Sequence, residues 1–425
     1  MNKIITKTIL LLSILYCNSL LAQSERPQIK EIKIEGLKKS RKKFINKLIH
    51  SSIGRALDSV LIAADIVRLI REPAISNAVY EVNQIDNKSV NLIFKIEENI
   101  TLIPGVDFWN TVDDKLAYHF GINDFNFMGL GYSAGVFYRQ NIHDGYGFIF
   151  GNPSFRKSKF GYMIIGQHSK TLEPIQQDEI ETFYDYTNRS LELFVDYELS
   201  VKNKVTLGIG SNYENYSKNK RSDLSTIKNN FKTTKLIGKI LFDHNRIQYD
   251  YYINEGFRNL SNLTIVLGKN INEENEFVSF ENNFTYYKKN NKNGNWATRI
   301  KLGFSNNTPT PFPAFVIDNN QNIRGSGNLV KRGSAIWILN TEYRHTLIEK
   351  KWFVLQANSF LDIGGIREPG SPLNNLFKNK SIHNRAGLGV RLIHKYIFKA
   401  IIRIDYGLSF DNNPGGLVFG IGQYF

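Results

Sequence analysis

The stretch that decides the fold is WATRIKLGF, residues Trp296–Phe304. Trp, Thr, Ile, Leu and Phe occupy alternate positions, whereas the positions between them include Arg299 and Lys301. Since successive side chains of a β-strand point to opposite faces, this pattern predicts a strand with one apolar and one charged face. Soluble β-sandwiches alternate too, but a charged face rich in arginine and glycine is typical of a strand between lipid and a wet lumen.

The same alternation continues towards the end of the sequence. In Phe398–Leu408, apolar residues occupy one face, and Lys399, Arg403 and Asp405 lie opposite. Because lipid offers no hydrogen-bond partners to an open sheet edge, such strands must close into a barrel. At roughly 20 residues for each strand and its connection, residues 105–425 predict a mainly β protein with a transmembrane antiparallel β-barrel of about sixteen strands.

The start of the sequence has the three regions of an export signal. Met1–Lys7 carries two lysines, Thr8–Leu21 is largely apolar, and Ala22 provides a small residue for cleavage. Cys17, the single cysteine of the sequence, lies inside this segment. We therefore expect residues 1–22 to be a signal peptide and the exported chain to lack a thiol that could form a disulfide.

Residues 27–98 combine strand and helix patterns. Gln28–Glu35 alternates apolar and charged residues, as a half-buried strand does. Two apolar stripes at helical spacing follow, the first with Ser40 as its expected N-cap, and two further strands are expected at 78–85 and 90–96. The predicted organisation is a signal peptide, a small α+β domain, a linker and a barrel, at residues 1–22, 27–98, 99–104 and 105–425.

The net charge of +15, with a pI near 9.5, indicates an anionic partner. Export argues against nucleic acid, so lipid headgroups are the expected counter-charge. The basic run Lys38–Lys43 stands where the first helix would begin, although positive charge is unfavourable at a helix N-terminus. Two interpretations are open for this run: a solvated surface, or contact with phosphate headgroups of the inner leaflet.

The last stretch, LVFGIGQYF, ends in aromatic residues. Strand alternation places Leu417, Phe419, Ile421 and Phe425 on one face. Together with Tyr424, these residues resemble the C-terminal signal by which bacterial outer-membrane barrels are recognised for insertion.

The N-terminal order of strand, helix, helix, strand and strand resembles a polypeptide-transport-associated (POTRA) domain. Two patterns frame that order, Ile32-x-Ile34-x-Gly36 at the front and Leu92-x-Phe94-x-Ile96-Glu97-Glu98 at the back. With the export signal and the barrel, this domain makes the chain similar to the BamA/TamA-type superfamily of outer-membrane assembly and translocation proteins, also described as surface-antigen-type barrels.

Motifs along the barrel carry the same resemblance. They are Gly121-x-x-Asp124-x-Asn126-x-x-Gly129-x-Gly131, Asn152-Pro153-Ser154-Phe155, Asp243-x-Asn245-Arg246 with Gly256, Ile323-Arg324-Gly325, Phe360-Leu361-Asp362-Ile363-Gly364 and Gly387-x-Gly389-x-Arg391. The sequence departs from the family pattern in lacking a proline before Gly256, in having Val316–Asp318 where a Gly-Gly pair is common, and in having Ser326 where an aromatic residue is common.

The arginine of the Ile323-Arg324-Gly325 motif lies in a long loop between two expected strands. We expect this loop to fold into the barrel, so that the guanidinium group meets a carboxylate on the inner wall. By strand parity Asp362 points into the lumen and is the first candidate partner. Glu342 and Asp405 are second candidates by the same parity, so the partner of Arg324 stays open at this point.

The resemblance implies a barrel in the outer membrane of a Gram-negative bacterium, with its N-terminal domain in the periplasm. The expected partners are unfolded outer-membrane or secreted polypeptides, outer-membrane lipids, and periplasmic or lipoprotein factors. A pore or surface ligand-binding protein with no assembly role is the alternative function, and client identity and the choice between insertion and secretion stay open.

No catalytic site, cofactor site or metal site is predicted. His143-Asp144 and His168-Ser169 are neighbours in sequence, and neighbouring side chains in extended chain point apart. Because the sequence also lacks a nucleophile elbow, a zinc-binding helix motif and a phosphate loop, we expect the chain not to be an enzyme.

Overall fold

The computed structural model describes most of the chain from Arg26 to Phe425. The residues outside the description are 1–25, 111–115, 142, 156–158, 178–179, 220–229, 251, 271–275, 307–313, 319–321, 327–330, 399 and 411–414. The expected signal peptide at residues 1–22 therefore lies outside the described residues. Within the described part of the chain, no helix is long and apolar enough to cross a membrane.

The N-terminal domain is a three-stranded sheet covered on one face by two helices. Its elements are β1 (Gln28–Glu35), α2 (Lys42–Leu48), α3 (Ser59–Arg71), β2 (Ile75–Asp86) and β3 (Ser89–Glu98). β3 lies in the middle of the sheet, parallel to β1 and antiparallel to β2. The apolar stripes of both helices pack on the sheet, where buried residues such as Phe44, Leu69 and Phe94 form the core.

Ser40 does not cap the first helix. α2 begins at Lys42, and Arg41 occupies the N-cap position without a side-chain hydrogen bond. The hydroxyl of Ser40 instead accepts a hydrogen bond of 2.9 Å from Nδ2 of Asn126, a residue of the barrel. The hydroxyl is thus drawn away from α2 by a contact between domains that the local pattern does not contain.

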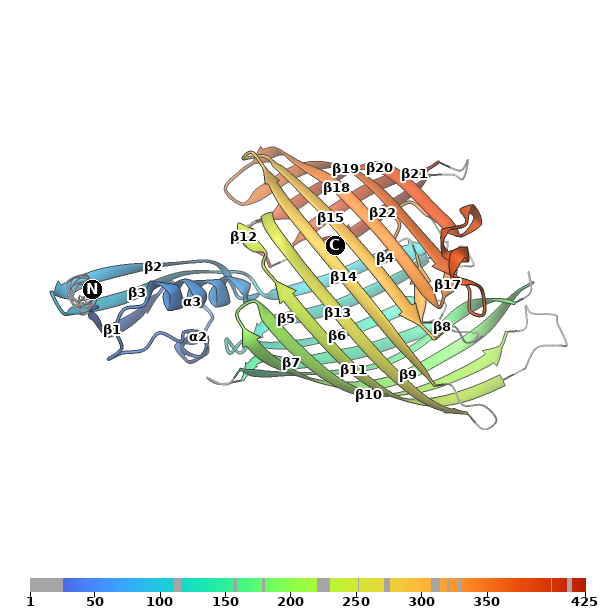
Figure 1. The fold of residues 1–425 in the computed structure, drawn as a ribbon, viewed down its shortest axis with the longest axis horizontal. Coiled ribbons are helices and arrows are strands. Elements are labelled where there is room, and N and C mark those ends of the chain that lie inside the picture. The colour runs from blue at the N-terminus through green and yellow to red at the C-terminus, as the bar shows by residue number, and fades with distance from the viewer. Residues whose placement is uncertain are drawn as a thin grey trace, which may run out of the picture.

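Sixteen strands of the described chain form an antiparallel barrel (Figure 1). They are β4 (Leu102–Asn110), β5 (Leu116–Phe127), β6 (Tyr132–Asn141), β7 (His143–Phe155), β8 (Phe160–Gln177), β9 (Ile180–Ser200), β10 (Asn203–Lys218), β11 (Asn230–Asn245), β13 (Ile253–Asn270), β14 (Phe277–Asn290), β15 (Gly294–Ser305), β18 (Ala335–Glu349), β19 (Phe353–Arg367), β20 (Ile382–His394), β21 (Ile401–Ser409) and β22 (Gly416–Ile421). A three-residue strand, β12 (Gln248–Asp250), pairs with the start of β13.

The outer face of the barrel is apolar and the inner face is polar. On β15 the side chains of Trp296 and Ile300 are exposed to the outside, whereas Ala297 is fully buried within. On β21 the outward residues Ile402 and Ile404 alternate with polar inward residues. This is the alternation that places one face of each strand in lipid.

β21 is shorter at its start than the alternation suggests. It begins at Ile401, so Phe398 and Ala400 lie before the strand rather than on its outer face. The amide of Ala400 donates to the carbonyl oxygen of Ile397 at 3.2 Å, and the amide of Phe398 donates to Ile100 at 3.1 Å. These hydrogen bonds hold the segment in a turn against the linker from the N-terminal domain.

The barrel closes where β22 lies beside β4. β22 contains six residues, so it offers at most six residues to each of its two neighbours. By contrast, β8 pairs with β9 along all of its 18 residues. Since each paired residue adds ladder hydrogen bonds, the seam between β22 and β4 is held by far fewer of them than the β8–β9 pair.

The N-terminal domain docks on one rim of the barrel, at the turn between β5 and β6 (Figure 1). Nζ of Lys39 forms an ion pair of 2.9 Å with Oδ2 of Asp124. The amide of Arg41 donates to the carbonyl oxygen of Gly129 at 2.8 Å. Gly131 has a φ of +72°, and an added Cβ would lie 2.2 Å from a ring carbon of Phe44. Asp124, Asn126, Gly129 and Gly131, which belong to the first of the barrel motifs, thus form the surface on which the domain docks.

The end of α3 makes a second contact with the same rim. Nε of Arg68 pairs with Oε1 of Glu198 at 3.2 Å. Nη2 of Arg71 donates to the carbonyl oxygen of Asn245 at 2.8 Å, and its Nη1 donates to the carbonyl oxygen of Val201. Two separate points of contact therefore fix the orientation of the domain on the barrel.

The basic run Lys38–Lys43 lies partly in the contact between the two domains and partly on the exposed surface. Lys39 is held by Asp124, whereas Lys42 and Lys43 are exposed. The run therefore belongs in part to the joint between the domains, and its expected contact with lipid headgroups concerns only the exposed members.

Gly131→Ala should loosen the N-terminal domain from the barrel, because the methyl group would collide with the ring of Phe44. We expect trypsin to cleave the run Lys38–Lys43 faster in the Gly131→Ala chain than in the unchanged chain. Gly54→Ala is the matched control, since Gly54 has a similar φ of +83° but open space around its Cβ position. Equal cleavage rates in the two variants would contradict the docking described here.

The carboxylate of Glu98 holds the segment that contacts the barrel. It accepts hydrogen bonds from the amides of Lys38 at 3.0 Å, Lys39 at 2.7 Å and Ser40 at 2.9 Å. Partial burial acts to raise the pKa of Glu98, but these hydrogen bonds outweigh it, and the pKa lies below its ordinary value of 4.5. The charged form of Glu98 therefore stabilises the docking segment.

The lowered pKa of Glu98 predicts an acid response. Its stabilisation should be complete above about pH 4.5 and lost as the pH falls through the lower folded-state pKa. Glu98→Gln should lower the hydrogen-exchange protection of amides 38–40 at neutral pH and remove its further loss in acid. Glu97→Gln, at the exposed neighbouring position, should behave as the unchanged chain does. An acid response that survives in Glu98→Gln would show that another group controls the segment.

Candidate functional site

The connection between β15 and β18, residues 306–334, folds into the barrel, and we call it the lumen loop. Its described parts include two short strands, β16 (Phe315–Ile317) and β17 (Lys331–Gly333), which pair with each other. An apolar cluster joins the loop to the inner wall. It consists of Phe315, Ile317, Ile323, Ile336, Ile338 and Ile366. Burial of Ile323 in this cluster places the next residue, Arg324, within the lumen.

Glycine backbones allow the tip of the lumen loop to touch β21 and β22. Gly325 has a φ of +82°, and an added Cβ would lie 2.7 Å from Cα of Gly407 in β21. A Cβ on Gly416, the first residue of β22, would lie 2.8 Å from the carbonyl oxygen of Gly325. The loop tip thus rests on the backbone of the strand that closes the barrel.

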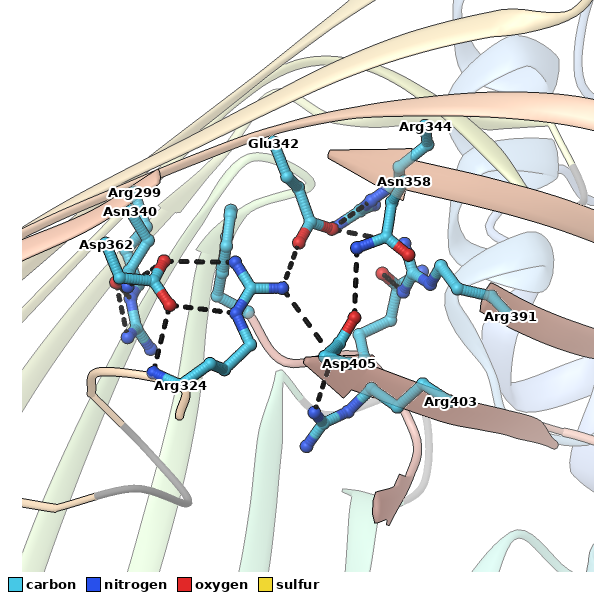
Figure 2. A network of polar contacts seen from close by, with 12 residues as sticks. Arg299, Arg324, Asn340, Glu342, Arg344, Asn358, Asp362, Arg391, Arg403 and Asp405 are labelled. Carbon is cyan, nitrogen blue, oxygen red and sulfur yellow. Dashed lines mark hydrogen bonds and ion pairs between the residues drawn. The ribbon is translucent and has the colours of Figure 1, made fainter. Parts of the chain in front are cut away.

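Arg324 binds Asp362 of β19 through a bidentate contact (Figure 2). Nε donates to Oδ2 at 2.8 Å, and Nη2 donates to Oδ1 at 3.0 Å. The backbone amide of Arg324 also donates to Oδ2 at 3.0 Å. Both side chains are almost completely buried. Such a paired, charge-assisted geometry is one that arginine provides and lysine does not.

The two other carboxylates that strand parity predicts also meet Arg324. Nη1 donates to Oε2 of Glu342 on β18 at 2.6 Å. The same nitrogen lies 3.7 Å from Oδ2 of Asp405 on β21. The structure therefore brings all three candidate partners together, with Asp362 and Glu342 bonded directly and Asp405 at ion-pair distance. One side chain of the loop is in this way connected to three separate strands of the wall.

Two aromatic rings contact the guanidinium group of Arg324. Its central carbon lies 3.8 Å from the centre of the Phe360 ring and 4.5 Å from the centre of the Tyr424 ring. A planar cation is attracted to the face of an aromatic ring, most strongly where water is excluded. The ring of Phe360 comes from β19, whereas Tyr424 follows β22, so the arginine also joins these two segments.

We call the surrounding polar network the Arg324 cluster (Figure 2). Its members are Arg299, Arg324, Asn340, Glu342, Arg344, Asn358, Phe360, Asp362, Arg391, Arg403, Asp405 and Tyr424. Asn340 donates to Asp362 at 2.8 Å and accepts from Arg299 at 2.6 Å. Asn340 therefore links the carboxylate of Asp362 to the guanidinium group of Arg299.

The cluster holds more cationic than anionic side chains. Five arginines face three carboxylates. Aromatic rings contact several of the additional arginines: Arg403 lies 4.9 Å from Tyr424, and Arg344 lies 5.7 Å from Phe425. Removing one charge from a buried network of this kind leaves the remaining charges without compensation. We therefore expect the loss of one charged side chain to destabilise the whole cluster.

The residues after β22 turn into the lumen. Gly422 has a φ of +92°, which breaks the strand alternation. Tyr424 then lies against Arg324, and the carbonyl oxygen of Phe425 accepts a hydrogen bond of 3.1 Å from the hydroxyl of Tyr287. Oε1 of Gln423 accepts from Nη2 of Arg391 at 2.8 Å. We call Gln423–Phe425 the inner tail.

The inner tail corrects the expectation that all the apolar C-terminal residues share one face. Leu417, Phe419 and Ile421 are exposed on the outer face, but Phe425 is not with them. The left-handed conformation at Gly422 reverses the direction in which the following side chains point. A recognition signal for insertion formed by these residues stays a prediction.

His143 and Asp144, neighbours in the sequence, contact different side chains. Nε2 of His143 lies 3.2 Å from Asp185, while Asp144 accepts a hydrogen bond from Tyr138. The described residues contain no group of three or more His, Cys, Asp or Glu that could hold a metal ion. The Arg324 cluster itself can bind and position, but it presents no nucleophile with an adjacent base.

The sequence patterns predict only Arg324, Asp362, Glu342 and Asp405 in this site and miss the other members of the cluster (Figure 2). Asn340 alternates in step with Glu342 on β18, and Phe360 alternates in step with Asp362 on β19, so both side chains are expected to point into the lumen. An aromatic ring among inward-facing polar residues could therefore have indicated a contact with Arg324. Tyr424 carries no such signal, because its position depends on the backbone conformation of Gly422.

Arg324→Ala should release the lumen loop while the barrel still assembles. Breaking a buried ion pair costs about 3–5 kcal/mol, so a cysteine at Ser326 should react about tenfold faster or more with a water-soluble maleimide. Arg324→Lys should restore little, since a point charge cannot replace the bidentate contact. Lys331→Ala removes a cation from β17 in the same loop, so it is the control and should leave the rate unchanged. Unchanged labelling in Arg324→Ala, with normal heat-modifiable migration, would overturn the role assigned to this residue.

Comparisons with known proteins identify the family and the fold. The model of the Omp85 superfamily domain matches residues 126–425. No curated protein sequence matches the chain. BamA from Haemophilus ducreyi lacking POTRA domains 1–3 is 14% identical, with 92% of this chain and 83% of that chain covered and a TM-score of 0.56.

Two further solved structures have a similar fold. CdiB from Escherichia coli is 13% identical, with 93% of this chain and 75% of that chain covered and a TM-score of 0.61. CdiB from Acinetobacter baumannii is 12% identical, with 93% and 73% covered and a TM-score of 0.58. The barrel fold indicates an outer-membrane protein. The chain belongs to the Omp85 superfamily.

Proposed function

We propose that the chain assists the insertion or translocation of polypeptides at the outer membrane of a Gram-negative bacterium. One observation carries the proposal: the lumen loop is connected to the strand that closes the barrel. Gly325 touches Gly416 at the start of β22, and Arg324 touches Tyr424 just after its end. A change in the loop is therefore transmitted to both ends of the seam strand, where a client strand or a widening barrel would have to act. Membership of the Omp85 superfamily supports a role with polypeptides at the family level.

The N-terminal domain would receive the client in the periplasm as a POTRA-type domain. The sheet order leaves β2 at one edge, with backbone hydrogen-bonding groups that β3 does not use. Exposed apolar side chains lie along this edge, at Val79, Tyr80, Val82 and Ile85. An edge strand with such side chains can add a client segment as a further strand, because the backbone supplies hydrogen bonds for any sequence.

A cavity connects this domain with the interior of the barrel. It has a volume of about 720 Å³. Arg71 and Pro73 of the domain line one side, and Tyr287 and Phe425 of the barrel line another. The cavity thus runs from the docked domain to the inner tail. In our proposal it is the route by which a client segment approaches the seam, and partner proteins of the periplasm would act at the outer side of the domain.

A pore or ligand-binding role is the second candidate. The lumen loop and the Arg324 cluster occupy the interior at the level of β18, β19 and β21, so conduction would require their displacement. Our proposal therefore treats the filled lumen as the resting state of a polypeptide-handling barrel, and it assigns no catalytic chemistry to the chain.

A reversible bond across the seam tests the proposal. Cysteine pairs between residues 416–421 and 102–110, in a Cys17→Ser background, should abolish function when oxidised and restore it on reduction. Function is read as the levels of other outer-membrane proteins, secreted proteins and surface lipids after depletion of the unmodified chain.

The control pair is Ser169→Cys with Asn188→Cys, which are paired neighbours in β8 and β9. Its oxidation should leave function unchanged, because no step of the proposal separates those strands. If depletion alters none of the three readouts, a polypeptide-handling role is excluded and the pore or ligand-binding role is favoured.

A further inference from the structure

The connection between β19 and β20 lies against the outside of the barrel, on the rim away from the N-terminal domain (Figure 1). It contains two short 3₁₀ helices, η1 (Leu373–Phe377) and η2 (Asn379–Ser381). Nε1 of Trp337, on β18, donates to the carbonyl oxygen of Leu376 at 3.2 Å. The ring of Phe377 stacks on Trp337 with centroids 6.0 Å apart.

Strand parity shows that this contact is on the lipid-facing side. Ile336 and Ile338 are buried in the apolar cluster of the lumen loop, so Trp337 between them points outward. Gly365 on β19 lies directly beneath the connection, because an added Cβ would be 2.4 Å from the carbonyl oxygen of Leu376. The connection is therefore folded down onto the outer wall rather than over the mouth of the barrel.

The folded connection leaves two large apolar side chains uncovered. Leu373 is 56% exposed and Phe377 is 63% exposed. These exposed fractions are similar to those of residues on the lipid-facing wall, such as Leu408 at 55% and Leu417 at 66%. An amphipathic segment that presents such side chains next to an apolar wall extends the surface that lipid covers.

The height of Trp337 places the segment at the membrane boundary. On β18 the outward-facing residues Trp337 and Leu347 are separated by about 25 Å along the membrane normal when the strand is tilted by about 40°. This matches the roughly 25 Å height of the apolar band of outer-membrane barrels, whose edges carry aromatic girdles. With Leu347 at the edge near the N-terminal domain, Trp337 and Phe377 stand at the opposite interface.

Lys378 and Lys380 lie one and three residues after Phe377, and both are exposed. No acidic residue occurs between Pro369 and Ser381. Two lysines at the polar boundary of lipid are attracted to anionic headgroups. The charge of the segment is therefore complementary to phosphate groups at the height that its aromatic residues define.

We propose that residues 372–381 form an interfacial anchor that binds phosphate-bearing lipid headgroups of the outer leaflet. Leu373 and Phe377 enter the lipid beside Trp337, while Lys378 and Lys380 pair with headgroup phosphates. The assignment to the outer leaflet rests on the orientation of the barrel in the proposed function. The binding of lipid by this segment does not require a polypeptide client, so it can hold even where the proposed function fails.

Spin-label depth measurements test the placement in lipid. The full chain, in a Cys17→Ser background, is reconstituted in phosphatidylglycerol vesicles with a label at Leu373→Cys or at Glu368→Cys, an exposed position of the same connection. The label at 373 should be more accessible to oxygen than to a water-soluble nickel complex, and the label at 368 should show the reverse. Water-like accessibility at both positions would overturn the proposal.

The lysine contribution is tested by changing the headgroup. In the unchanged lysine background, mobility of a label at Asn374→Cys should be lower in phosphatidylglycerol vesicles than in phosphatidylcholine vesicles. Lys378→Glu with Lys380→Glu should remove this difference, and the two Lys→Arg changes should keep it. Lys350→Glu with Lys351→Glu, at the opposite rim, is the matched control and should have no effect.

Inorganic phosphate added to phosphatidylcholine vesicles separates free phosphate from lipid phosphate. It should not reproduce the loss of mobility, because the proposed site requires the membrane surface. A label that responds to free phosphate, or that ignores lipid charge, would contradict the assignment to lipid headgroups.

Discussion

The rest of the site depends on the burial of one guanidinium group. Arg324 is 1% exposed, and a charge removed from water in this way must be compensated by nearby charges and hydrogen bonds. Asp362 and Glu342 supply that compensation directly. The required partners sit on β18 and β19, so the loop can satisfy its arginine only by entering the lumen.

The same constraint extends to the closing strand through contacts that need no side chain. Gly325, Gly407 and Gly416 approach one another so closely that a methyl group on any of them would collide. The inner tail adds the ring of Tyr424, whose centre lies 4.5 Å from the central carbon of the guanidinium group. The six-residue strand β22 is in this way held at both ends by contacts with the lumen loop, in addition to the hydrogen bonds to its neighbouring strands. This arrangement is compatible with a seam that opens when the loop moves.

Strand parity accounts for how much of this site can be predicted from the sequence. The alternation in Trp296–Phe304 and in the strand containing Asp405 predicts a barrel, because lipid and lumen impose opposite chemistry on the two faces. The same parity places Asp362 and Glu342 inside, without deciding which of them Arg324 would bind. Which carboxylate Arg324 binds depends on how deeply the loop enters the lumen, and this depth cannot be predicted from a local sequence pattern.

Parity fails where the backbone leaves the extended conformation or where another domain intervenes. Gly422 turns Tyr424 and Phe425 inward, so counting alternate residues past it assigns the wrong face. Ser40 reads as a helix cap because its residue type favours that role, but Asn126 of the barrel takes up its hydroxyl. The position of the segment 372–381 on the outer wall could likewise not be predicted from its sequence, because it depends on a hydrogen bond from Trp337 of β18.

The central claim is that the lumen loop controls the seam through Arg324 and the inner tail. It is tested most directly by the distance distribution between spin labels at Phe419→Cys on β22 and Leu102→Cys on β4, measured by double electron–electron resonance in lipid. Arg324→Ala should broaden this distribution and shift it to longer distances, although Arg324 belongs to neither strand. An unchanged distribution in an Arg324→Ala chain whose loop is demonstrably released would contradict the account.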